Sequence, residues 1–191
     1  MDLQEFLNIM NSGKPVKGFS DIHIMMTQLS QEAMQITSEL NGSYHTPEEI
    51  RELFSKLIGK PVDDHFGMFP PFYTDCGKNI TIGKGVFINM SCHFQDQGGI
   101  TIGDDCLIGH NVMMATLNHG FAPEDRHSLY PAPIHIGRNV WIGAGATILQ
   151  NVTIGDNAII GACSLVNKDV PANTVYAGIP AKFIKRIEDV K

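Results

Sequence analysis

His119 is a candidate for acid–base chemistry and lies in the stretch Thr116-Leu117-Asn118-His119-Gly120. A neutral imidazole can accept a proton from a hydroxyl group near pH 7. The deprotonated oxygen can then attack an activated acyl group such as a thioester. The chain has eight histidines, so residue type alone does not select His119. Its position, where a long loop leaves the repeat described below, makes it a candidate.

An internal six-residue repeat predicts those elements. Ile or Val recurs every six positions from Ile136 to Val166, and a small or β-branched residue stands four positions after each. A longer string, aliphatic-x-Ile-Gly, begins at Ile80, Ile100, Ile134 and Val152. Alternation within each hexapeptide sends one large and one small residue inward, and stacked coils bury a common core. The pattern predicts a mainly β protein, with a parallel β-helix of about four coils over residues 70–179.

Two insertions interrupt this repeat. The first lies between Phe94 and Ile102, and the second and much longer one lies between Met114 and Ile136. Both follow the same strand of a coil, so residues 95–99 and the protruding loop at about 115–133 should be neighbours in space. A long loop that leaves a regular solenoid usually serves function. His119 lies where this loop begins.

The two ends of the chain have other patterns. Residues 1–69 are expected to form an N-terminal helical segment and lead-in, with helical spacing of apolar residues at 3–10 and 21–40. A capping box at Thr46, with Pro47 at the first helical position, opens a third helix that Gly59 closes. Residues 68–77 are expected to be an extended lead-in, and residues 180–191 a C-terminal cap.

Composition excludes several classes of function. The formal net charge of −6 argues against nucleic acid as a partner, since phosphate binding needs clustered cations. No apolar run is long enough for a membrane span, and the first residues lack the pattern of a secretory signal. The four cysteines have no CxxC spacing, which favours reduced thiols and a cytoplasmic location.

Residues from about 43 to 188 resemble the maltose and galactoside O-acetyltransferase group of the hexapeptide-repeat acyltransferases. The most specific matches are the string Asn-Val-Trp-Ile-Gly at 139–143 and the ending Ala-Gly-Ile-Pro-Ala at 177–181. The resemblance implies a left-handed β-helix and an acetyl-CoA-dependent O-acetyltransferase that acts on a hydroxyl of a sugar or similar small acceptor. It also implies a homotrimer with active sites between subunits, and no metal.

The same resemblance assigns roles to the acceptor side of the site. His119 matches the family's general base, and Asn89 matches the asparagine that stabilises the transition state and binds the acceptor. Asp75 matches an acceptor-binding position. Gln97 stands where the galactoside enzymes carry an acceptor-binding aspartate, with Asp96 beside it, so the identity of the acceptor stays open.

The cofactor positions follow from the resemblance too. Ala144 matches the residue whose backbone N–H contacts the thioester carbonyl, and Trp141 should face outward, where it could pack against the pantetheine or a neighbouring subunit. The remaining residues expected to bind coenzyme A are Ala162, Asn167, Lys168, Lys182 and Lys185.

Other interpretations remain open at this point. Five histidines between 93 and 135 make a zinc protein of the γ-type carbonic anhydrase kind worth considering, but no spacing matches such a site. A non-enzymatic solenoid scaffold would leave the 115–133 loop without a role. Within the acyltransferases, the alternative activity is O-acetylation of an antibiotic or another xenobiotic.

Overall fold

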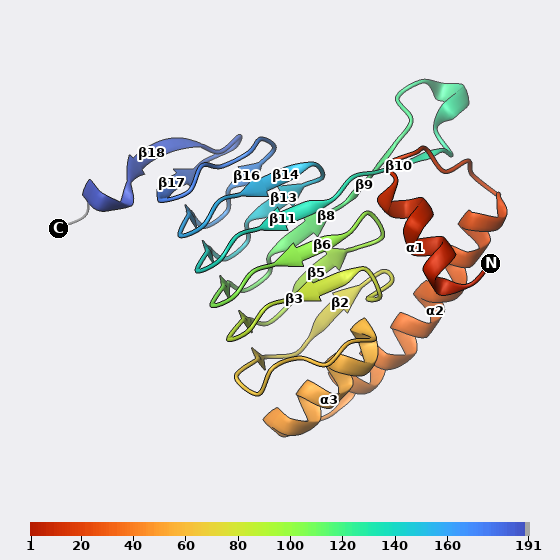
Figure 1. Cartoon of the computed structure of the whole chain (residues 1–191), viewed down its shortest axis with the longest axis horizontal. Coiled ribbons are helices and arrows are strands. Elements are labelled where there is room, and N and C mark those ends of the chain that lie inside the picture. The colour runs from red at the N-terminus through yellow and green to blue at the C-terminus, as the bar shows by residue number, and fades with distance from the viewer. Residues whose placement is uncertain (190–191) are drawn as a thin grey trace.

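The computed structural model describes residues 1–189, so the last two residues of the expected C-terminal cap lie outside the described part. Figure 1 shows a β-solenoid with three helices gathered at its N-terminal end and a long hairpin that projects beside them. No helix within residues 1–189 is long and apolar enough to cross a membrane.

The three predicted helices are present, with capped N-termini. α1 spans Leu3–Asn11, α2 spans Asp21–Gly42 and α3 spans Pro47–Ile58. A side-chain oxygen of Asp2, Ser20 or Thr46 accepts a hydrogen bond from the N–H three residues later, which satisfies a donor that the helix itself cannot pair. The capping box of α3 is complete, and Gly59 ends the helix with a φ of 70°.

The rest of the chain winds into a parallel β-solenoid with three faces, each a sheet with about one short strand per turn. The first sheet contains β1 (Gly67–Met68), β4 (Phe87–Ile88), β7 (Leu107–Ile108), β12 (Trp141–Ile142), β15 (Ile159–Ile160) and β17 (Thr174–Ala177), followed by the antiparallel β18 (Lys182–Arg186). The second contains β2 (Phe72–Thr74), β5 (Cys92–Gln95), β8 (Met113–Ala115), β13 (Thr147–Leu149) and β16 (Leu165–Val166). The third contains β3 (Ile80–Ile82), β6 (Ile100–Ile102), β11 (Ile134–Ile136) and β14 (Val152–Ile154).

The solenoid has about six turns, two more than the repeat predicts. Its first sheet holds six parallel strands, from β1 to β17. The stretch expected as an extended lead-in is itself a turn, because β1 pairs with β4 and β2 pairs with β5. Met68 and Phe72 replace Ile and Val there, which hides this turn from the six-residue pattern. The solenoid therefore starts at Gly67 rather than at residue 70.

Equivalent residues stack from turn to turn and fill the interior. Ile80, Ile100, Ile134 and Val152 stand in register across the third sheet, and all four are buried. Burial of each such side chain stabilises the folded state by roughly 1.5–3 kcal/mol. This column confirms the inward positions that the repeat predicts.

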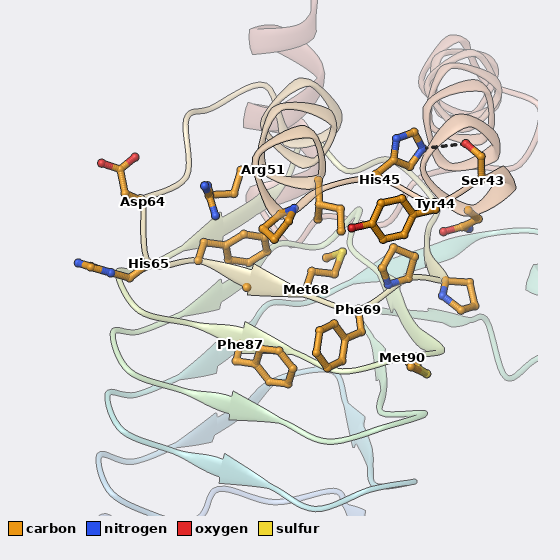
Figure 2. A pocket seen from close by; sticks show the side chains of 17 residues that line it. Ser43, Tyr44, His45, Arg51, Asp64, His65, Met68, Phe69, Phe87 and Met90 are labelled. Carbon is orange, nitrogen blue, oxygen red and sulfur yellow. Dashed lines mark hydrogen bonds between the residues drawn. The ribbon is translucent and has the colours of Figure 1, made fainter.

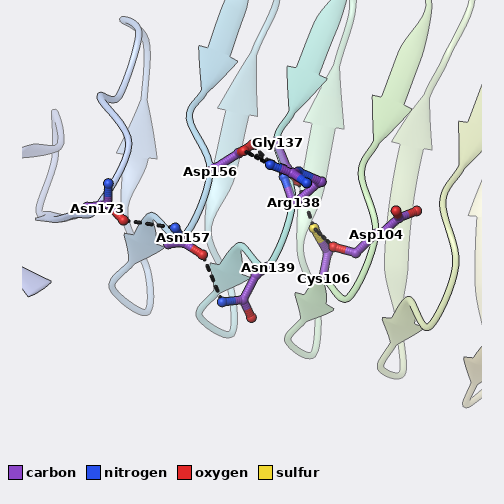
Figure 3. Close-up of polar contacts among 8 residues, drawn as sticks. All are labelled: Asp104, Cys106, Gly137, Arg138, Asn139, Asp156, Asn157 and Asn173. Atoms are coloured by element: carbon purple, nitrogen blue, oxygen red, sulfur yellow. Dashed lines mark hydrogen bonds and ion pairs between the residues drawn. The ribbon is translucent and has the colours of Figure 1, made fainter.

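Polar ladders hold the turns together at one outer edge. Asn139 donates to Asn157 over 2.9 Å, and Asn157 donates to Asn173 over 2.8 Å (Figure 3). These three residues have positive φ, a conformation that asparagine tolerates better than most residues. Beside them the Arg138 guanidinium pairs with Asp156 over 2.9 Å. The hydrogen bond from the Arg138 backbone N–H, with that from its side chain, holds the pKa of the Asp156 carboxyl below its usual range.

The large insertion forms an antiparallel hairpin. β9 (Leu117–His119) pairs with β10 (Leu129–Pro131), and the short helix η1 (Pro123–Asp125) lies in the tip between them. Its base contacts the smaller insertion, since the Thr116 N–H donates to the Gln95 carbonyl over 3.1 Å. The prediction that the two insertions are neighbours is confirmed.

Candidate active site

The predicted site residues lie on two different corners of the prism. We call the turn between the first and second sheets corner 1; it includes residues 89–91, 143–145 and 161–163. The turn between the second and third sheets is corner 2; it includes residues 75–79, 96–99, 167–169 and the base of the hairpin. A four-residue strand such as β5, roughly 13 Å long, separates the two corners within one turn.

His119 ends strand β9 on the hairpin at corner 2, and its side chain is exposed. Its Nδ1 lies 2.8 Å from the backbone carbonyl oxygen of Arg126. A carbonyl can only accept, so Nδ1 must carry the proton in this contact. In the neutral ring the other nitrogen, Nε2, is then unprotonated. The hairpin thus presents the imidazole in the tautomer that a general base requires.

The hairpin tip fixes the carbonyl that orients His119. The Arg126 side chain folds back and donates to the carbonyls of Gly120 and Phe121, both over 3.0 Å. Asp125 accepts from the hydroxyls of Ser128 and Tyr130, and these bonds lower the pKa of its carboxyl. Bonds that close within the tip keep Arg126 opposite His119.

The hairpin base is clamped by the smaller insertion. The Thr116 hydroxyl is buried; it donates to the Gln95 carbonyl over 2.6 Å and accepts from the Gly98 N–H over 2.8 Å. A β-carbon on Gly98 would lie 2.7 Å from the Thr116 carbonyl oxygen and 2.9 Å from the backbone of Ala132. Only glycine allows the two insertions to approach this closely.

The three predicted acceptor-binding residues of corner 2 have different surroundings. Asp75 is half-buried and accepts a bond of 3.2 Å from the Gln97 amide nitrogen. Gln97 is 3% exposed, and its amide oxygen is buried without a hydrogen-bond partner among residues 1–189. An unpaired buried acceptor costs about 1–3 kcal/mol, so this oxygen would gain from a donor supplied by a ligand or by water.

Asp96 cannot contact an acceptor in this structure, which corrects the prediction for that residue. Its side chain has no exposed surface and accepts bonds from the Thr74 hydroxyl and from the N–H groups of Cys76, Gly77 and Asn79, over 2.7–3.1 Å. Burial raises the pKa of the Asp96 carboxyl, and these four bonds oppose that rise. Asp96 shapes the turn that carries Asp75. A short polar side chain in a turn is the signal that could have indicated this role.

Corner 1 carries Asn89, Ala144 and Ala162. Asn89 is half-buried, and its side-chain oxygen accepts from the Met90 N–H over 2.9 Å, which fixes the orientation of its amide group. Ala144 and Ala162 are exposed and lie at the same position of successive turns. Within residues 1–189 no hydrogen bond uses the Ala144 N–H.

The other expected cofactor residues are all on the surface. Trp141 is 53% exposed and points outward from β12, between Leu107 and Ile159 of the adjacent strands. Asn167 and Lys168 lie at corner 2, whereas Lys182 and Lys185 belong to β18 at the end of the first sheet. One chain therefore does not bring all of these residues together.

A cavity of about 650 Å³ adjoins corner 1. Its walls include Tyr44, Phe69, Phe87 and Met90, with Arg51, Asp64 and His65 also at its border (Figure 2). Sequence reasoning missed this cavity, because residues from the α2–α3 connection and from two solenoid turns form it jointly. Its size and its mainly apolar lining are typical of small-molecule sites.

Three of the four cysteines are buried, and their thiols are unreactive. Burial raises the pKa of Cys92 and Cys106 to about 11 and that of Cys76 to about 12. These thiols are therefore protonated near neutral pH and poor nucleophiles. Within residues 1–189, no group of three or more His, Cys, Asp or Glu side chains is placed to hold a metal ion.

Comparison with known proteins decides the family. Profiles described as "Bacterial transferase hexapeptide (six repeats)" and "Hexapeptide repeat of succinyl-transferase" match residues 133–168 and 99–117. The galactoside O-acetyltransferase of Escherichia coli K12 is 40% identical over 153 residues, which is 79% of this chain and 75% of that protein. The chain belongs to the hexapeptide-repeat acetyltransferases.

Solved structures of this acetyltransferase family share the fold over nearly the whole chain. A maltose O-acetyltransferase from Clostridium difficile 630 superimposes with a TM-score of 0.87 at 32% identity, covering 95% of this chain and 96% of that one. A hexapeptide-repeat acetyltransferase of Vibrio cholerae O1 biovar eltor, complexed with acetyl coenzyme A, gives a TM-score of 0.79 at 32% identity, with 95% and 98% covered.

Several residues of this acetyltransferase that shape the site carried no recognisable signal in the sequence. Arg126 looks like an ordinary loop cation, and Thr116 and Gly98 look like ordinary turn residues. Their importance comes from contacts between the two insertions. The predicted proximity of those insertions was the one available indication.

Proposed function

We propose that the protein transfers the acetyl group of acetyl-CoA to a hydroxyl of a sugar or a similar small acceptor, with His119 as the general base. The observation that carries this proposal is the 2.8 Å contact between His119 Nδ1 and the Arg126 carbonyl, which leaves Nε2 unprotonated on an exposed hairpin. The family membership supports the donor, and the names of the galactoside and maltose enzymes support the class of acceptor.

The proposed transfer is direct. Nε2 of His119 takes the proton of the acceptor hydroxyl while its oxygen forms a bond to the acetyl carbon. The Ala144 N–H and the Asn89 amide stabilise the negative charge that develops on the carbonyl oxygen. The carbon–sulfur bond then breaks, and the imidazolium returns its proton to the leaving thiolate. Atoms and charge balance without an acetyl-enzyme, so both substrates must be bound together.

The two corners suggest that the site forms between copies of the chain. His119, Asp75 and Gln97 are at corner 2, whereas Asn89 and Ala144 are at corner 1, one strand away. A homotrimer in which corner 1 of one subunit meets corner 2 of the next would unite them, and closed rings of identical subunits are a common solution. Exposed apolar residues such as Leu107 and Trp141 are available for packing between prisms.

The acceptor pocket would combine polar and apolar parts. Asp75, which the Gln97 amide holds in place, can bind a hydroxyl group, and the cavity at corner 1 can hold a bulkier part of the acceptor. Gln97 in place of a second carboxylate beside Asp75 lowers the negative charge of this pocket. We therefore expect an acceptor preference different from that of the galactoside enzymes.

A thiol-release assay tests the function. Acetyl-CoA is incubated with the protein and a panel of sugars, polyols and hydroxyl-bearing antibiotics, and free coenzyme A is followed with a thiol reagent. We expect acceptor-dependent release with at least one sugar or polyol. Release only with the antibiotics would favour xenobiotic acetylation, and no release with any hydroxyl acceptor would contradict the proposal.

A further inference from the structure

The segment between α1 and α2 lies directly against the hairpin that carries His119. We call residues 13–19 the arm (Figure 1). The Val16 N–H donates to the Leu129 carbonyl over 2.8 Å, and the Leu129 N–H donates to the Val16 carbonyl over 2.8 Å. Leu129 is also the residue paired with His119 across the hairpin. Val16, Leu129 and His119 therefore form one row across the arm and the two strands of the hairpin.

A small hydrophobic core joins the arm to both strands of the hairpin. Val16 and Leu129 are buried in it, and Leu117 of β9 packs against it. Helices α1 and α2 supply most of its other members: Phe6, Met10, Met26 and Leu29. This core is separate from the solenoid core and also includes Cys76 of corner 2, so it ties the arm and the hairpin to the first turn of the solenoid.

Two further contacts fix the arm. Gly18 lies so close to the hairpin that a β-carbon there would be 2.6 Å from the His127 carbonyl oxygen. The Phe19 and His127 rings lie 5.5 Å apart. At the other end of the arm, the Asn79 amide donates to Asn11 over 2.8 Å, which ties α1 to corner 2.

A hairpin on its own needs such support. An isolated two-stranded ribbon is marginally stable in water, and a third strand with a hydrophobic face changes that. A base must also be held close to its productive geometry, because a displacement of about 1 Å can cost on the order of 100-fold in rate. The arm adds a third chain segment beside the hairpin, through the bridge between Val16 and Leu129, the residue paired with His119.

We infer that the arm, with Val16 at its centre, positions the catalytic base. It acts through Leu129 on the place and orientation of His119. The inference rests on the proposed role of His119 as general base. It gives the arm a function in turnover that the sequence pattern did not suggest.

A double-mutant cycle on the full-length protein tests this inference. Val16→Pro removes the N–H that pairs with Leu129, whereas Val16→Ile keeps both backbone bonds and the buried side chain. We expect Val16→Pro to lower kcat on the order of 10- to 100-fold with the KM for acetyl-CoA unchanged, and Val16→Ile to retain the rate. In a His119→Ala background, Val16→Pro should have little further effect, because there is no base left to misplace.

Controls separate positioning from a general loss of structure. Leu40→Ala truncates a buried residue of the solenoid core far from the arm; it should lower thermal stability yet keep kcat. If Val16→Pro does not fold, Gly18→Ala forces the arm away from His127 and should give the same loss of kcat. A normal kcat in folded Val16→Pro or Gly18→Ala, or an equal loss with and without His119, would overturn the inference. A His119→Ala variant with normal kcat would instead overturn the proposed function.

Discussion

At the scale of single residues, the geometry of His119 depends on a backbone atom rather than on a carboxylate. A backbone carbonyl cannot be lost by substitution of Arg126, but it can be moved when the tip rearranges. The protonation of His119 Nδ1 is thus tied to the conformation of residues 120–128. The local order of the tip is therefore a condition for the proposed role of His119 as general base.

Replacing His119 tests its role directly. General-base assistance typically contributes about 10²–10⁴ in rate, so His119→Ala should lower kcat by that factor while the KM for acetyl-CoA stays the same. His135→Ala, which removes an exposed histidine from the third sheet, should leave both quantities unchanged. A His119→Ala enzyme with wild-type kcat would show that another group takes the proton.

The residue scale also shows where sequence reasoning stopped. His119 and Asn89 were identified by resemblance, and their exposure is compatible with the assigned roles. Asp96 was misjudged, because a buried turn carboxylate and a ligand-binding carboxylate look alike in a single sequence. Its four hydrogen-bond donors come from residues 17–22 positions earlier, a distance over which local pattern says nothing.

At the scale of elements, the clamp between the two insertions can be tested with glycine substitutions. Gly98→Ala places a β-carbon against backbone atoms of Thr116 and Ala132 that cannot retreat. We expect residues 116–118 at the start of the hairpin to shift. The imidazole of His119, the proposed general base, should move with them and kcat should fall about 10-fold or more. Gly42→Ala is the matched control, because nothing lies within 4 Å of its added carbon. Equal activity of the two variants would show that the clamp does not influence His119.

The hairpin tip should respond to acid through Asp125. Hydrogen bonds from Ser128 and Tyr130 lower the pKa of this carboxyl, so its ionised form stabilises the folded tip. That contribution is present above the ordinary aspartate range, near pH 4, and is lost as the pH falls through the lowered value. Amide hydrogen exchange of residues 120–128, corrected for intrinsic rates, should therefore accelerate on acidification.

Two substitutions check this assignment. Asp125→Asn should remove the acid transition of the tip, whereas Glu124→Gln, which neutralises the adjacent exposed carboxylate, should keep it. A transition that survives in Asp125→Asn would point to another group.

The elements were predictable where the pattern is periodic and less so where it is not. The helices and the inner turns follow from apolar spacing, a capping box and the Ile-rich columns. The first turn was missed because Met68 and Phe72 fill its inward positions. The arm was missed because a single bridge at Val16 has no sequence period at all.

At the scale of the whole molecule, a mixing experiment tests whether the site is shared between subunits. His119→Ala and Asn89→Ala each disable a different corner and should be inactive alone. If corner 1 of one copy meets corner 2 of another, subunits mixed at equal amounts by denaturation and refolding should form intact sites at about a quarter of positions. Light scattering should show a trimer throughout. No recovery of activity, or a monomer at micromolar concentration, would contradict the shared site.

Strand β18, which closes the last turn of the solenoid, should keep the protein soluble by preventing end-to-end association. Turns stack because each parallel strand leaves N–H and C=O groups for the next, and the same groups on the last strand could bind another molecule. β18 covers β17 in the opposite direction and carries Lys182, Lys185 and Arg186 along its exposed length. A reversed, positively charged edge strand is a poor template for further growth. Without residues 181–191, end-to-end polymerisation into fibres should compete with folding, and sedimentation would reveal it.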